Sequence, residues 1–263
     1  MKTFQRPSQE DLLSYQELQD RKITEKIVKD GETLWYVKMN YNEDIKKREK
    51  LAYLIGSPWA NIAEVDDIDD IELEQLAGLG IVSSDNKRAK DIYLVRLAQS
   101  YSVADLPQRD LTLATARELV YSLLVRRRDA HQKNRVYISG VPISFDYHVA
   151  FLQEGEGLRT EDGFYSREPK DWRVKMTEQT ISTQSLLSFS GYSYTHFVHD
   201  LEVYKQEVQG FCEVIRTDKR NYVQVATTAG FNRDEATTVS TFIEESRNNL
   251  NPLRLIQVTT QDL

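Results

Sequence analysis

The stretch RRRDAHQKNRVYISGVPISFDYHVAF, residues 126–151, places two short apolar runs between polar segments. The runs Arg135–Ile138 and Val141–Phe145 are separated only by Ser139 and Gly140. Two short apolar runs with so brief a glycine-containing connection predict a β-hairpin. One polar loop leads into this hairpin and another leaves it, so the hairpin brings side chains from both loops to one strand pair.

Three polar side chains flank the hairpin: Asp129 and Asn134 precede it, and Asp146 follows it. Phosphoryl transfer uses an aspartate, an asparagine and a second aspartate in this order. The first aspartate takes the proton of the acceptor hydroxyl, and the other two residues hold the Mg²⁺ ions that bridge the phosphates of ATP. The pattern predicts Asp129 as a catalytic residue and Asn134 and Asp146 as metal and nucleotide ligands.

Both loops resemble those of one enzyme family. Asp129–Asn134, DAHQKN, is similar to the D-x-H-x-x-N catalytic loop of the HipA-like kinases and their phosphoinositide-kinase-like relatives. Ser144–Phe151, SFDYHVAF, resembles their metal-binding segment, an apolar strand that ends in aspartate. The resemblance implies an α+β, bilobal protein-kinase-like fold. Its small β-rich N-lobe would comprise residues 1–99, and its mainly helical C-lobe residues 100–263.

A second hairpin is predicted near the N-terminus. Lys22–Lys29 alternates apolar and polar residues, Asp30-Gly31 is a strong turn signal, and Leu34–Met39 supplies the returning strand. The returning strand carries Lys38, for which two interpretations stay open. Its ammonium group can lie in solvent, as in most sheet lysines, or it can contact the α- and β-phosphates of ATP, as the resemblance implies.

Residues 42–55 have the apolar spacing of a helix. Glu49 stands three residues before Ala52, as a glutamate precedes an alanine in the corresponding helix of HipA-like kinases. The resemblance therefore implies that Glu49 pairs with Lys38 and that both are catalytic residues. Glu43 is the other candidate partner, and a solvated helix glutamate is the alternative interpretation of Glu49.

Further elements follow on both sides of the hairpin loops. The acidic run Asp66–Asp70 predicts a solvated start to a helix over Ile71–Leu79, because aspartates suit a helix N-terminus. Asp91–Leu97 predicts a strand, and the resemblance implies that the connector after it, with Ala98 and Gln99, offers backbone groups to adenine. More helices are predicted from Asp110 to the arginines at 126–128, over Thr195–Arg216 and over Asp234–Asn248.

Composition narrows the functional class. The 41 acidic residues exceed the 34 Lys and Arg, so the net charge of −7 disfavours nucleic-acid binding, which needs a basic footprint. The single cysteine, Cys212, cannot form an internal disulfide and indicates a reducing compartment. The sequence lacks a signal peptide and a membrane span, so we expect a cytoplasmic protein.

The sequence as a whole predicts an ATP- and Mg²⁺-dependent phosphotransferase, most closely a HipA-like serine/threonine protein kinase. The resemblance implies a protein substrate and an antitoxin or regulatory partner. Two alternatives stay open: a kinase-fold enzyme acting on a lipid or small molecule, and a catalytically silent kinase-like binding or toxin–antitoxin module. The chain departs from the kinase pattern at one place, since residues 14–30 contain no glycine to build a phosphate-covering loop.

Overall fold

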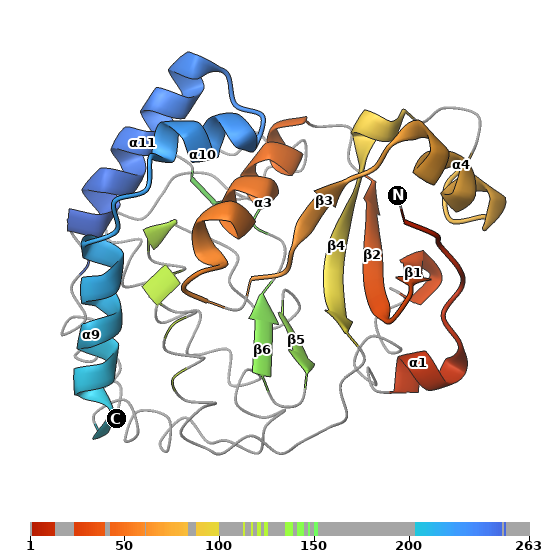
Figure 1. Cartoon of the computed structure of the whole chain (residues 1–263), viewed down its shortest axis with the longest axis horizontal. Coiled ribbons are helices and arrows are strands. Elements are labelled where there is room, and N and C mark those ends of the chain that lie inside the picture. Colours follow the sequence, from red (N-terminus) through yellow and green to blue (C-terminus); the bar gives the residue numbers. More distant parts are fainter. Residues whose placement is uncertain are drawn as a thin grey trace, which may run out of the picture.

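The computed structural model has a mixed α+β architecture, in which a small antiparallel sheet is flanked by several helices (Figure 1). It confirms the predicted α+β class. The residues that the structure describes are 2–13, 24–39, 43–60, 62–83, 88–99, 113, 117, 120, 121, 124, 125, 135–138, 141–144, 147, 150, 151, 203–248 and 250.

The sheet has four strands in the order β1-β2-β4-β3, and every neighbouring pair is antiparallel. The strands are β1 (Ile27–Asp30), β2 (Thr33–Met39), β3 (Val65–Asp67) and β4 (Ile92–Gln99). The predicted first hairpin is confirmed as β1–β2, with Gly31 at φ 57° in its turn, a conformation that favours glycine. β1 begins later than predicted, because Thr24–Lys26 forms a turn of 3-10 helix.

Both faces of the sheet are covered. One face packs against α4 (Asp70–Gly78) and the N-terminal arm, where Phe4 is buried and Gln5 bridges to Lys29. The predicted helix over 71–79 is thus confirmed, and Asp69 begins it with a capping box. Buried residues of this face are Val28, Trp35, Val37, Ile68, Leu76, Ile81, Val82, Ile92 and Leu94.

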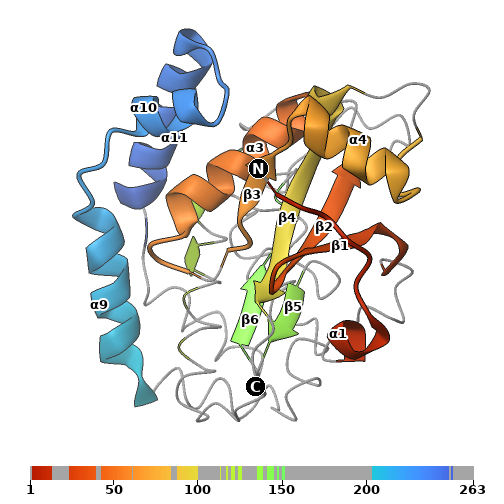
Figure 2. The ribbon, with the colours of Figure 1, turned by 45° about the vertical axis from the view of Figure 1, so that its right-hand side comes forward.

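The opposite face of the sheet receives α3 (Glu43–Gly56), the helix predicted over 42–55. Tyr53 of α3 packs against the buried side chains of that face, Ile27, Leu34, Ala63, Val65, Tyr93, Val95 and Leu97. On its other side α3 meets the C-terminal helices, so it lies between the sheet and α10–α11 in both views (Figures 1 and 2). The helix α3 therefore contributes side chains to two hydrophobic cores.

The second core is built mainly from helices. α9 (Lys205–Arg216) and α11 (Arg233–Asn248) lie within or near the predicted ranges, and α10 (Tyr222–Thr228) was not predicted. Of the described residues of the helix predicted from Asp110, five are helical and Val125 is in a turn; the helical ones are Leu113, Arg117, Val120, Tyr121 and Leu124. The buried members of this core include Leu51, Ala52, Ile55, Tyr121, Leu124, Tyr147, Val208, Cys212, Ile215, Tyr222, Ala226 and Ile243.

The hairpin predicted within residues 126–151 is also confirmed. It consists of β5 (Arg135–Ile138) and β6 (Val141–Ser144), paired antiparallel with Arg135 opposite Ser144. In both views it lies next to the C-terminal end of β4 (Figures 1 and 2). The remaining short elements are the helix α1 (Gln9–Leu13) and a 3-10 turn at Ala89–Asp91. No described helix is long and apolar enough to cross a membrane.

Close packing at the end of α3 generates the first prediction. A Cβ on Gly56 would lie 2.5 Å from Cζ of Tyr121 and 2.7 Å from Cγ1 of Ile62, and Tyr121 is itself fixed by its hydroxyl, which donates to the carbonyl of Ala52. We expect Gly56→Ala to lower the free energy of unfolding by about 1–3 kcal/mol through overpacking. Urea unfolding followed by circular dichroism measures the change.

Gly210 is the matched control, because it lies inside α9 and a Cβ there would meet nothing within 4 Å. Gly210→Ala should raise the free energy of unfolding by up to about 1 kcal/mol, through helix propensity. Equal effects of the two substitutions would contradict the packing described for Gly56.

Candidate functional site

Lys38 lies near the end of β2, on the face of the sheet that receives α3. Side chains alternate along a strand, so Lys38 shares this face with Leu34 and Tyr36, and Tyr93 stands opposite it on β4. The Lys38 Nζ is 5.9 Å from the centre of the Tyr93 ring. The strand thus directs the ammonium group toward the helix and not into solvent.

The partner of Lys38 is Glu49. The Lys38 Nζ donates to Oε1 of Glu49 at 2.6 Å, and the two side chains are 14 % and 2 % exposed. The solvent-exposed interpretations of both residues are therefore wrong. The other candidate, Glu43, is 72 % exposed and lies 3.6 Å from Lys47, one helical turn away.

A pair of lysines holds α3 against the sheet beside this contact. Lys46 and Lys50 both bind the carboxylate of Asp67 on β3, with Lys46 Nζ 2.6 Å from Oδ1. Burial alone would raise the pKa of Asp67, but the hydrogen bonds from the two lysines outweigh it and the pKa is lowered. Asp67 is thus a strand residue that anchors α3, which corrects its prediction as part of a solvated helix start.

Ala98 and Gln99 form the C-terminal end of β4. Their Cα partners on β2 are Leu34 and Thr33, whereas the partner of Lys38 is Tyr93. The four residue steps from Leu34 to Lys38 span about 13 Å along the strand. β3 pairs with β4 only as far as Val95, so no described strand covers the outer edge of Ala98 and Gln99.

Asp129, Asn134 and Asp146 lie outside the described residues. The described hairpin between the two loops has Arg135 and Ser144 paired at its open end, and the chain continues from that end to Asn134 on one side and Asp146 on the other. Among the described residues alone, no three acidic, histidine or cysteine side chains gather into a metal-binding group.

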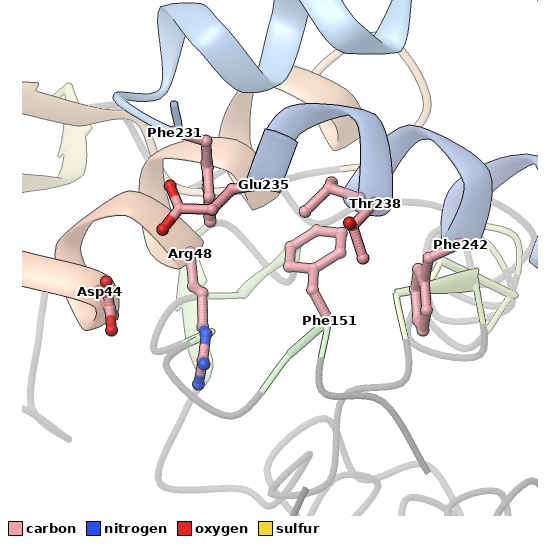
Figure 3. Close-up of a pocket in the computed structure, with 8 residues that line it drawn as sticks. Asp44, Arg48, Phe151, Phe231, Glu235, Thr238 and Phe242 are labelled. Carbon is pink, nitrogen blue, oxygen red and sulfur yellow. The ribbon is translucent and has the colours of Figure 1, made fainter. Parts of the chain in front are cut away.

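A hollow of about 230 Å³ lies between α3 and α11 (Figure 3). Phe151, at φ 61°, lies between Arg48 of α3 and the residues of α11. The lining residues are Asp44, Arg48, Phe151, Phe231, Glu235, Thr238, Val239 and Phe242. The N-terminal half of α3 therefore borders open space where it faces the C-terminal helices.

Sequence reasoning missed one residue near this site, Arg220. Its guanidinium group donates to the carbonyls of Leu54 and Ile55 at the end of α3. The signal in the sequence was Pro58, which ends the helix and has no N–H to offer it. Nothing local pointed to the donor, because it lies more than 160 residues further along the chain.

Cys212 is buried in the helical core, and burial raises the pKa of its thiol to about 11. The thiol is therefore protonated at neutral pH and is not a nucleophile.

Comparison of the chain with known protein families, with curated proteins and with solved structures finds no match.

The buried pair generates the second prediction. Removing one partner leaves the other as a buried charge, so Lys38→Met and Glu49→Leu should each lower the free energy of unfolding by about 3 kcal/mol. The double variant removes both charges and should cost less than the sum of the single changes by more than about 1 kcal/mol. Urea unfolding of the four proteins gives this coupling energy.

The exposed pair Lys47 and Glu43 on the same helix is the control, and its coupling should be below about 0.5 kcal/mol. Additive losses at Lys38 and Glu49 would show that the two side chains do not act as a pair.

Proposed function

We propose that this chain is an ATP- and Mg²⁺-dependent phosphotransferase with a bilobal kinase-like fold, of the HipA-like type, acting on a serine or threonine of a protein substrate. The observation that carries the proposal is the 2.6 Å ion pair between Lys38 on an inner strand and Glu49 on the next helix. Protein kinases use a strand lysine held by a helix glutamate to contact the phosphates of ATP.

The position of the pair supports this role. A partly buried lysine that pairs with a buried carboxylate has its ammonium group fixed in one place, so it can bind a phosphate without further ordering. A lysine ammonium group has three N–H donors, and one of those of Lys38 binds Glu49. Lys38 would therefore present positive charge on the face of the sheet that receives α3, while Glu49 holds it.

The end of β4 supports the adenine part of the proposal. Leu34, the β2 partner of Ala98, lies about 13 Å from Lys38 along β2, a span comparable with an extended nucleotide. The backbone edge of these two residues would bind adenine while Lys38 binds phosphates. The β5–β6 hairpin lies next to the same end of β4, which favours an active site between the sheet and the hairpin loops (Figures 1 and 2).

The proposed roles of the loop residues follow from their chemistry. Asn134 and Asp146 would provide the oxygen ligands that Mg²⁺ prefers, and the bound ion would supply positive charge to the transferring phosphoryl group. Asp129 orients the acceptor hydroxyl and takes its proton. Catalysis in this scheme is positioning and charge stabilisation by Lys38 and the metal, with no covalent enzyme intermediate.

The third prediction tests nucleotide binding. We expect Asp146→Ala to abolish Mg²⁺-dependent binding of ATP, because the metal loses its carboxylate ligand, while the circular dichroism spectrum stays unchanged. Isothermal titration calorimetry with Mg·ATP measures the affinity. Asp234→Ala, at the exposed start of α11, is the matched control and should bind as the wild type does. Wild-type affinity in Asp146→Ala would remove Asp146 from the metal site.

The fourth prediction separates a proton acceptor from a metal ligand within one loop. Asp129→Asn keeps the volume of the side chain but cannot take the proton. We expect it to bind Mg·ATP normally and to lose phosphoryl transfer by about 10²–10⁴-fold. Asn134→Ala should instead lose metal affinity, and higher Mg²⁺ or Mn²⁺ should partly restore its rate.

Transfer is measured with radiolabelled ATP and a cell lysate as the source of acceptor. Failure of the wild type to bind Mg·ATP and to transfer phosphate would overturn the kinase proposal in favour of a silent kinase-like binding module. Wild-type transfer rates in Asp129→Asn would contradict only the role given to that residue.

A further inference from the structure

The C-terminal end of α3 has to find partners for its last backbone carbonyls, which have no donors within the helix. Two of them are satisfied locally. The carbonyl of Tyr53 accepts from the N–H of Ser57 at 2.9 Å, and that of Gly56 accepts from the N–H groups of Trp59 and Ala60, each at 2.8 Å. The carbonyls between these two belong to Leu54 and Ile55.

Local backbone does not serve Leu54 and Ile55. The residue four positions after Leu54 is Pro58, which has no N–H, and the residue four positions after Ile55 is Trp59, whose N–H is directed to Gly56. The donors come instead from Arg220. Its Nη1 donates to Leu54 at 3.0 Å and its Nη2 to Ile55 at 2.9 Å. A cation at this place also complements the negative end of the helix dipole.

Arg220 is held in position from three sides. Its Nε donates to Oδ2 of Asp218 at 2.6 Å, and its guanidinium group stacks over the ring of Trp59 at 4.3 Å. Asp218 in turn accepts from the hydroxyl of Tyr222 at 2.9 Å. Each of the three guanidinium nitrogens thus donates a hydrogen bond, two to α3 and one to the turn between α9 and α10. Lysine could not reproduce this fork geometry.

The contact lies close to the Lys38–Glu49 pair. Glu49 precedes Leu54 by five residues, which is about 7.5 Å along a rigid helix. The other end of α3 borders the hollow that Figure 3 shows, so α3 meets the C-terminal helices firmly at the Arg220 end and loosely at the Asp44 end. A displacement of the Arg220 end would therefore carry Glu49 with it.

We infer that Arg220 is a positioning residue: it fixes α3 at its C-terminal end and so keeps Glu49 within hydrogen-bonding distance of Lys38. The effect of Arg220 on phosphoryl transfer rests on the proposed function, but its effect on the Lys38–Glu49 contact does not. The two can be tested separately, since the contact can be measured without ATP.

The test measures the chemical reactivity of Lys38 in Arg220→Gln. An ion pair disfavours the neutral, nucleophilic amine, so loss of the pair should raise the rate of reductive methylation of Lys38 by about tenfold. Mass spectrometry of the folded protein at one fixed pH gives the rate, with exposed Lys219 as the internal reference. Glu49→Gln is the positive control, because it removes the charge of the partner directly.

Arg216→Gln is the matched control. Arg216 also donates to a backbone carbonyl, that of Leu250 at 2.8 Å, and pairs with Glu213, but these contacts lie within the C-terminal helices. The Arg216→Gln substitution should leave the reactivity of Lys38 unchanged. In a second arm, Arg220→Gln should raise KM for ATP and lower kcat together, whereas Arg216→Gln should change neither.

The methylation rate of Lys38 decides the inference. An unchanged methylation rate of Lys38 in folded Arg220→Gln overturns it, whatever the protein does with ATP. If Arg220→Gln does not fold, Arg220→Lys takes its place, and an intermediate rise in Lys38 reactivity supports the inference while wild-type reactivity overturns it. A rise in reactivity combined with no ATP binding by the wild type supports the positioning role and overturns the kinase proposal alone.

Discussion

A buried carboxylate between two hydrophobic cores sets the arrangement of this molecule. Glu49 is 2 % exposed on a helix that packs against the sheet on one side and against the C-terminal helices on the other. An unpaired charge there would cost several kcal/mol of folding free energy. The helix α3 therefore packs in the position where Glu49 contacts Lys38. Lys38 of β2 thereby fixes the rotation of the helix, and the pairs of Lys46 and Lys50 with Asp67 fix the helix against β3.

Local patterns in the sequence were sufficient to predict the two hairpins that carry the proposed site. Alternation around Asp30-Gly31 predicted β1–β2, and the short connection at Ser139-Gly140 predicted β5–β6 to within one residue of its observed end. The pairing of Lys38 with Glu49 followed from family resemblance, and the observed distance agrees with it. The roles in binding and catalysis of the site residues, and the division into two lobes, stay predictions.

What the sequence did not reveal depends on contacts between distant parts of the chain. The seven-residue helix α10 has too few turns to show an apolar period, and its packing on α3 and α11 stabilises it. Asp67 stood in an acidic run that resembled a helix start, yet only the folded sheet brings it to two lysines of α3. The bond from Arg220 to Leu54 spans 166 positions, and no periodicity reports such a contact.

The dependence of α3 on Arg220 also orders events during synthesis of the chain. A ribosome that adds about 5–20 residues per second needs roughly 10–30 s to pass from Ile55 to Arg220. During this interval the residues of α3 have been synthesised, but the donor for the carbonyls of Leu54 and Ile55 and the helices that cover Leu51 and Ile55 have not. The N-terminal part of the nascent chain therefore exposes apolar side chains of α3, a surface to which a chaperone can bind until α10 has been synthesised.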